Sequence, residues 1–170
     1  MNLIDKIRVI EDYPVKGVSF KDITTLLRDP EAFHQAIELM IEAASEIDFN
    51  VILAAEARGF VVGAPMAYAM KKGFILVRKP GKLPAKTIRR EYELEYGKDF
   101  LEIHEGAIMP GDKVLIVDDL LATGGTSAAV KEMVLSEGAH VAGYVYLIEL
   151  EFLEGRKKLG DYPVKSIIRY

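Results

Sequence analysis

The sequence predicts an α/β fold in which a twisted parallel sheet is flanked by helices. Short, continuous apolar segments of the kind found in strands buried on both faces recur along the chain. Segments with helical periodicity lie between them, so each pair of neighbouring strands can be joined by a right-handed helical crossover. A length of 170 residues suits a single domain, here residues 1–170.

The first third of the chain has three recognisable segments. Leu3, Ile4, Ile7 and Ile10 recur at helical spacing, which predicts a short opening helix that ends before Tyr13-Pro14. Residues 17–24 have no clear period and are interpreted as a loop or a short extended segment. Apolar residues from 33 to 47 fall on one face of a helix, which predicts a long helix in this segment. Asp29 can cap this helix and Pro30 can start it.

The rest of the chain alternates between strands and helices. Residues 51–55 and 74–77 are apolar runs typical of buried strands, and a tight turn at 56–59 and a helix at 60–70 separate them. Residues 78–103 lack such runs and predict an exposed hairpin flap. The remaining predicted elements are strands at 113–117, 141–150 and 164–168 and helices at 125–137 and 152–159.

Composition limits the classes of function. The formal net charge is -4 and the pI is about 5.5, which argues against sequence-independent binding of nucleic acid. The longest apolar run, 60–70, contains Gly63 and Pro65 and is far shorter than the roughly 20 residues of a membrane span. The N-terminus mixes charges with apolar residues, so no secretory signal is predicted and the cytoplasm is the expected location.

One segment of this acidic chain is strongly basic. Between residues 78 and 90 the chain has six basic residues and no acidic one. Such a segment could attract a small polyanion, or it could be a solvated basic loop, and charge alone leaves both interpretations open.

The segment after the third predicted strand carries the clearest chemistry. Residues 118–126 read Asp-Asp-Leu-Leu-Ala-Thr-Gly-Gly-Thr and lead directly into a helix. Ligands of open parallel sheets bind beyond the carboxyl ends of the strands, and glycines, hydroxyls and a helix N-terminus there suit a phosphate. Asp118 and Asp119 would repel that phosphate, so their partner is a sugar hydroxyl or Mg²⁺. The alternative is an ordinary helix N-cap with acidic residues near the dipole.

These residues carry a family resemblance. Residues 114–126 resemble the phosphoribosyl-diphosphate signature of the type I phosphoribosyltransferases. Residues 17–24, 56–60, 77–84 and 94–97 are similar, in order and spacing, to the adenine phosphoribosyltransferases of that family. The last two stretches are the more specific ones, and the resemblance extends along nearly the whole chain.

The resemblance implies a reaction and a set of site residues. Adenine would displace diphosphate from phosphoribosyl diphosphate to give AMP, with Mg²⁺ as the cofactor bound mainly through the substrate. Asp118 and Asp119 would hold the ribose hydroxyls and face the positive charge that grows on the sugar. The 5′-phosphate would be bound by Ala122, Thr123, Gly124, Gly125 and Thr126, and the diphosphate by Arg58, Gly59, Lys79 and Lys82.

The resemblance also implies mobile and accessory parts. Residues 82–96 would form a lid that excludes water, and residues 1–30 a small hood. Glu95, within the lid, would handle a proton near the imidazole ring of the base. Adenine would lie against Val18, Phe20, Lys21 and Leu120. Family members are commonly homodimers, and neither a nucleic acid nor a membrane is an expected partner.

Two alternative functions share the sugar site. The chain could transfer the phosphoribosyl group to an oxopurine such as xanthine or hypoxanthine, although the base-side segments argue against this. It could also be a regulator that senses phosphoribosyl diphosphate and binds nucleic acid. The acidic pI, the full lid and the lack of an added DNA-binding segment favour catalysis.

Overall fold

The structure is a computed structural model that describes residues 1–94 and 97–170. These residues form two compact units, Met1–Leu39 and Met40–Tyr170. The single domain 1–170, the hood at 1–30 and the lid at 82–96 stay predictions.

The N-terminal unit opens with strands rather than with the predicted helix. A single 3₁₀ turn, η1 (Leu3–Lys6), is followed by β1 (Arg8–Ile10), which pairs antiparallel with β2 (Phe20–Asp22). The predicted opening helix is therefore wrong beyond its first turn. β-Branched residues favour an extended chain, and the Arg8 guanidinium Nε donates to Asp22 Oδ2 at 2.8 Å across the strand pair.

Two helices complete this unit. The short helix α1 (Thr24–Arg28) was not predicted, whereas α2 (Pro30–Ser45) starts where the sequence places it. The backbone N–H groups of Glu31 and Ala32 both donate to Asp29 Oδ1 at 3.1 Å, which confirms the predicted cap.

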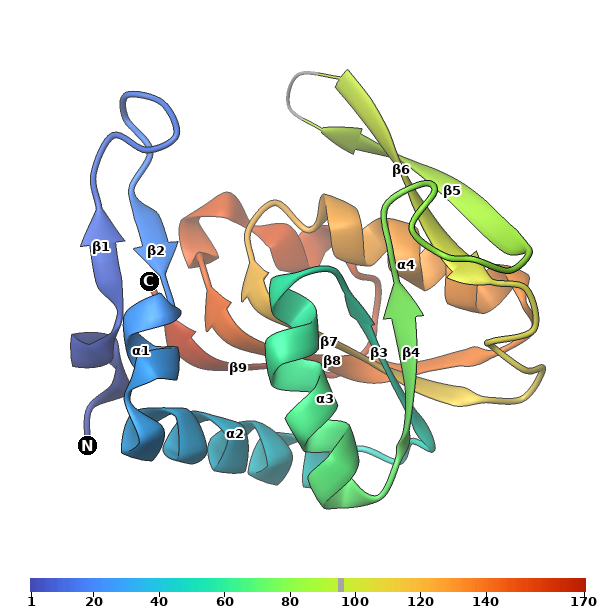
Figure 1. The fold of residues 1–170 in the computed structure, drawn as a ribbon, viewed down its shortest axis with the longest axis horizontal. Helices are drawn as coiled ribbons and strands as arrows, with labels where there is room; N and C mark the ends of the chain where they lie inside the picture. Colours follow the sequence, from blue (N-terminus) through green and yellow to red (C-terminus); the bar gives the residue numbers. More distant parts are fainter. Residues whose placement is uncertain (95–96) are drawn as a thin grey trace. The chain divides into compact units, whose positions relative to one another are not determined.

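The second unit is built on a five-stranded sheet, and every strand pair in it is parallel. This arrangement confirms the predicted fold class (Figure 1). The strand order is β4-β3-β7-β8-β9, which places the ends of β3 and β7 side by side. The strands are β3 (Val51–Ala55), β4 (Gly73–Val77), β7 (Lys113–Leu121), β8 (His140–Glu149) and β9 (Val164–Arg169).

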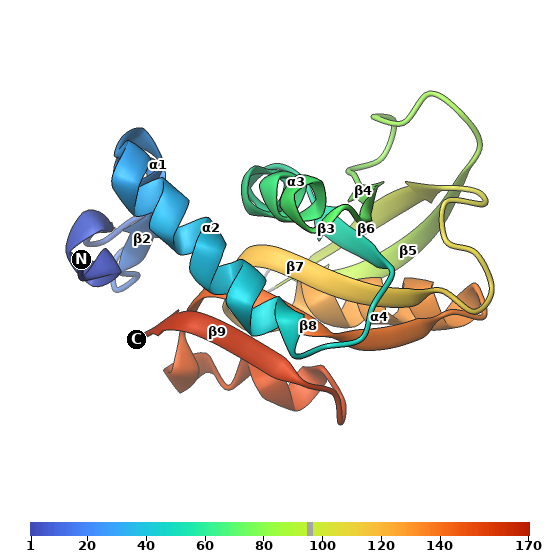
Figure 2. The same ribbon diagram turned by 90° about the horizontal axis from the view of Figure 1, so that it is seen from below.

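Helices α3 (Arg58–Met70) and α4 (Gly125–Ser136) lie on opposite faces of this sheet (Figure 2). Side chains alternate along a strand, so Leu53 joins the apolar cluster that includes Val130 of α4, while Ala54 faces α3. A Cβ atom at Gly63 of α3 would lie only 3.1 Å from that of Ala54. Helix α3 begins two residues before its predicted start.

The predicted flap is a hairpin of β5 (Thr87–Leu94) and β6 (Gly97–His104), and β5 packs against α4. The helix expected at 152–159 is wrong. The chain there forms two 3₁₀ turns, η2 (Glu151–Leu153) and η3 (Gly155–Lys158), separated by Glu154 at a left-handed φ of 53°. Among the described residues, no helix combines the length and apolar character needed to span a membrane.

Candidate active site

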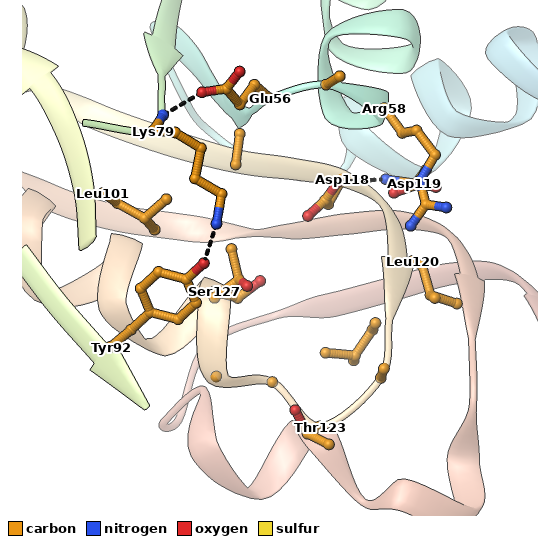
Figure 3. A pocket seen from close by; sticks show the side chains of 17 residues that line it. Glu56, Arg58, Lys79, Tyr92, Leu101, Asp118, Asp119, Leu120, Thr123 and Ser127 are labelled. Carbon is orange, nitrogen blue, oxygen red and sulfur yellow. Dashed lines mark hydrogen bonds and ion pairs between the residues drawn. The ribbon is translucent and has the colours of Figure 1, made fainter. Parts of the chain in front are cut away.

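A cavity of about 450 Å³ lies beyond the carboxyl ends of β3 and β7 (Figure 3). The loops after strands β3, β4 and β7 all contribute to it, as the sequence predicts for an open parallel sheet. Its lining consists of Ala55, Glu56, Ala57, Arg58, Lys79, Tyr92, Leu101 and residues 118–127.

The lower wall of this cavity is the phosphate loop, residues 122–126. Gly124 is the N-cap of α4 with φ 83°, a left-handed conformation that favours glycine. In this helix no side chain caps the N-terminus, and its first turn has no acidic residue. The first backbone N–H groups of a helix have no partners within it, and the dipole adds partial positive charge. The loop can therefore bind a phosphate through its main chain.

Asp118 and Asp119 form the acidic wall at the end of β7, which continues four residues past its predicted end at 117. Asp119 is only 5% exposed, and its Oδ2 lies 2.8 Å from Nε of Arg58. Asp118 Oδ1 accepts the backbone N–H of Asp119 at 2.9 Å. Removal from water, and secondly the neighbouring Asp119 carboxylate, raise the pKa of Asp118 well above its ordinary value.

Gly59 shapes this wall from behind. It is buried in the first turn of α3 and is not among the residues that line the cavity. A Cβ atom at this position would lie 2.9 Å from Asp118 Oδ1. The structure thus gives a reason for glycine that the sequence did not reveal, namely space for the Asp118 carboxylate. A diphosphate contact at Gly59 stays a prediction.

The predicted diphosphate cations are only partly brought together. Lys79 reaches the cavity, where its Nζ lies 2.5 Å from both the Tyr92 hydroxyl and Asp99 Oδ2 (Figure 3 shows the first contact). Lys82 is exposed and does not line the cavity. The backbone of Lys82 does contact Lys79, because the Lys82 N–H donates to the Lys79 carbonyl at 3.3 Å.

Three further residues were not predicted for the site. Tyr92 was assigned to an exposed hairpin, but it is 7% exposed and belongs to the apolar cluster beneath the cavity. Glu56 accepts the backbone N–H of Lys79, and its Oε2 lies 3.3 Å from Arg78 Nη2. Asp99 lies opposite Tyr92 in the hairpin register. The alternation of Tyr92 with glutamates along β5 could have signalled one buried face.

The predicted base-side residues come from different units. Phe20 and Lys21 lie in β2, opposite Ile10 and Val9, and the Val18 carbonyl accepts the backbone N–H of Tyr13 at 3.1 Å. Leu120 lines the cavity of the second unit. Their joint contact with adenine stays a prediction, and Glu95 lies outside the described residues.

The acidic wall fits a magnesium ion that arrives with a substrate. The described residues contain no group of three or more His, Cys, Asp or Glu side chains that could hold a metal by themselves. Mg²⁺ typically takes one or two carboxylates together with phosphate oxygens and water. Asp118 and Asp119 are the aspartates that line the cavity, and they can supply the protein's part of such a set.

Known proteins with similar sequence and structure identify the family. A profile of the phosphoribosyl transferase domain family matches residues 22–168. The adenine phosphoribosyltransferase of Desulforamulus reducens is 56% identical over 169 residues, which cover 99% of this chain and 98% of that protein.

Two solved structures agree with this result. The crystal structure of adenine phosphoribosyltransferase from Thermoanaerobacter pseudethanolicus matches with a TM-score of 0.96 and 52% identity, over 99% of this chain and 100% of that one. The Saccharomyces cerevisiae enzyme, in complex with adenine and an imino-altritol bisphosphate, matches with a TM-score of 0.89 and 38% identity, over 97% and 96% of the two chains. This chain therefore belongs to the phosphoribosyltransferase family and, within it, to the adenine phosphoribosyltransferases.

Proposed function

We propose that the cavity catalyses the reaction of adenine with 5-phosphoribosyl 1-diphosphate to give AMP and diphosphate, a step of purine salvage. One observation carries the proposal. In a chain of this family, a main-chain phosphate loop, a pair of aspartates and the side chains of Arg58 and Lys79 surround a single cavity.

The sugar phosphate would lie between the loop and the aspartates. The 5′-phosphate is bound by the N–H groups and hydroxyls of residues 122–126, where the helix dipole favours its charge. Asp118 and Asp119 accept hydrogen bonds from the ribose hydroxyls. When the bond from the anomeric carbon to the diphosphate breaks, positive charge grows on the ribose, and negative groups held beside it stabilise that transition state.

The diphosphate would leave toward the cations. Arg58 can bind phosphate oxygens bidentately once it turns from Asp119, and the Lys79 ammonium can pair with them as a point charge once it turns from Asp99. Lys82 and Gly59 are proposed as further contacts. Mg²⁺ bound with the diphosphate supplies charge neutralisation when it is present.

The base side rests on the resemblance. We place adenine against Val18, Phe20, Lys21 and Leu120, and we assign Glu95 to the proton near its imidazole ring. A homodimer and a cytoplasmic location are parts of the same proposal. The adenine found in the Saccharomyces cerevisiae complex supports the choice of base.

A mixing experiment tests the substrate. Purified protein is supplied with phosphoribosyl diphosphate, Mg²⁺ and one purine at a time, and nucleotide formation is followed by chromatography. We expect AMP from adenine and little product from hypoxanthine or xanthine. Preferential formation of an oxopurine nucleotide would select the second enzyme, and no nucleotide from any base would favour the regulator.

A variant tests the role of the aspartates. Asp119→Asn removes one charge without changing shape, and we expect turnover to fall by roughly 10²-fold, the size seen when one electrostatic group is removed from an active site. The Kd for ribose 5-phosphate should change much less, because the loop is intact. Asp161→Asn, at an exposed position, is the matched control. Equal turnover in the two variants would remove the proposed role of Asp119.

A further inference from the structure

The phosphate loop is packed directly against the backbone of a distant segment. Gly155 opens η3 and is buried. A Cβ atom at Gly155 would lie 2.4 Å from the Ala122 carbonyl oxygen and 3.2 Å from the Gly124 nitrogen. In the reverse direction, a Cβ atom at Gly124 would lie 2.5 Å from the Gly155 carbonyl oxygen. The two main chains are thus in contact because neither position has a side chain.

The Gly155 segment is in turn fixed to the central sheet. Arg156 donates from Nε and Nη2 to the two carboxylate oxygens of Glu149, at 2.6 and 2.7 Å, and from Nη1 to the Val164 carbonyl at 3.1 Å. Glu149 is 3% exposed and lies opposite Leu121 in the parallel register of β7 and β8. Leu121 is the residue that immediately precedes the phosphate loop. One ion pair therefore connects η3 to β8, at the residue that lies opposite the end of β7 from which the loop starts.

We infer that Gly155, held in place by Arg156 and Glu149, is a positioning residue for the 5′-phosphate loop. The inference rests on the proposed function, because it assigns residues 122–126 to the phosphate of ribose 5-phosphate. Main-chain N–H groups bind an anion tightly only if they already point at one place before the ligand arrives. The loop has no side-chain cap at the start of α4, and the contact with Gly155 supports its backbone from outside the cavity.

A single methyl group tests this contact. Gly155 does not have a left-handed φ, so alanine fits its local conformation and Gly155→Ala isolates the effect of close approach. The added Cβ would have to move the Ala122 carbonyl by about 1 Å, and a misplacement of this size costs on the order of 10²-fold at a binding or reacting centre. We expect the Kd for ribose 5-phosphate, measured by calorimetry, to rise at least about tenfold, while the KM for adenine stays the same.

The matched control is Gly73→Ala in β4. It adds the same methyl group at the start of a strand of the central sheet, where the nearest atom is a Val51 side-chain carbon at 3.4 Å. We expect its Kd for ribose 5-phosphate to equal that of the unmodified protein. Thermal melting of both variants shows whether any loss of binding simply follows a loss of stability.

A second variant leaves the glycine intact. Arg156→Lys keeps the charge next to Glu149 but loses the two-pronged contact that fixes η3. We expect a several-fold rise in the same Kd, with Lys157→Arg as the exposed neighbouring control.

The outcomes separate the two proposals. If the unmodified protein does not bind ribose 5-phosphate, the proposed function fails and the positioning role fails with it. If the unmodified protein binds ribose 5-phosphate and both Gly155→Ala and Arg156→Lys bind it with the same Kd as the unmodified protein, the proposed function stands and the positioning role is overturned. A lower melting temperature with an unchanged Kd would overturn it as well, since it would show a purely structural contact.

Discussion

Gly59→Ala tests whether the Asp118 carboxylate must occupy its observed position. The new Cβ would lie 2.9 Å from Asp118 Oδ1, whereas ordinary contacts begin at 3.4 Å. The backbone of Asp118 belongs to strand β7 and is paired with Tyr146 of β8, directly after the residues paired with β3, so we expect the side chain to move rather than the strand.

The size of the effect follows from this overlap. The carboxylate must move by about 0.5 Å, which a rotation of roughly 30° away from its preferred angle can supply at a cost of about 0.5–1.5 kcal/mol. Because displacements of about 1 Å reduce rates by up to 10²-fold, we expect half of that shift to lower kcat/KM for phosphoribosyl diphosphate by about tenfold. A tenfold loss corresponds to about 1.4 kcal/mol of transition-state stabilisation.

Gly63→Ala is the control for this experiment. Gly63 lies one turn further along the same helix, and its added Cβ would overlap at least as much, at 2.9 Å from a Phe74 ring carbon and 3.1 Å from the Ala54 Cβ. Both substitutions replace glycine by alanine within α3, so alanine's higher helix propensity acts in the same direction in both variants. Only Gly59 adjoins the cavity wall. Steady-state kinetics and thermal melting of the two variants would refute the reasoning if Gly59→Ala kept wild-type kcat/KM or lost no more of it than Gly63→Ala.

Two further predictions concern the charges of the site. Because the pKa of Asp118 is higher in the folded chain than its unfolded value of about 3.9, protonation favours folding below that pH, and this contribution is lost as the pH rises through the folded pKa. Asp118→Asn should therefore raise the melting temperature near pH 8, by roughly 2–4 °C if the gain is about 1 kcal/mol, and should lose this advantage in acid; a lower melting temperature at pH 8 would contradict the prediction. Asp99→Asn should lower the KM for phosphoribosyl diphosphate by a few-fold at most, because it frees Lys79 from a partly exposed ion pair, and such pairs contribute little in water. The difference should shrink in high salt, and Asp48→Asn, which affects an ion pair to Lys113 remote from the cavity, is the control.

Local patterns were enough to predict the sheet and the helices that flank it. The runs at 51–55 and 114–117 are apolar throughout because both of their faces are covered, and such runs can be recognised without knowledge of their partners. The opening segment failed because Ile7 and Ile10 suit a strand as well as a helix, and pairing with β2 decided between the two. The final helix failed at Glu154, whose left-handed conformation no local pattern indicates.

The candidate site also contains residues that local sequence patterns predict and contacts that they do not. Residues 118–126 are contiguous, so one stretch of sequence contains both the acids and the phosphate loop. The space behind Asp118 depends on Gly59 of another element, and the support of the loop depends on Gly155, about thirty residues away in the chain. Contacts of this kind arise from sheet register and helix packing, which a reading of single segments does not supply.

Both cations that line the cavity are already paired with carboxylates in the described structure. Arg58 contacts Asp119, and Lys79 contacts Asp99. A diphosphate that takes over Nε of Arg58 or the ammonium of Lys79 displaces an acid, and its net affinity is then the difference between new and lost pairs. The two displaced acids differ in position: Asp99 belongs to the hairpin, whereas Asp119 stays in the cavity wall. Under the proposed function, a diphosphate that takes Nε of Arg58 from Asp119 would leave the Asp119 charge beside the ribose, where positive charge must next be stabilised.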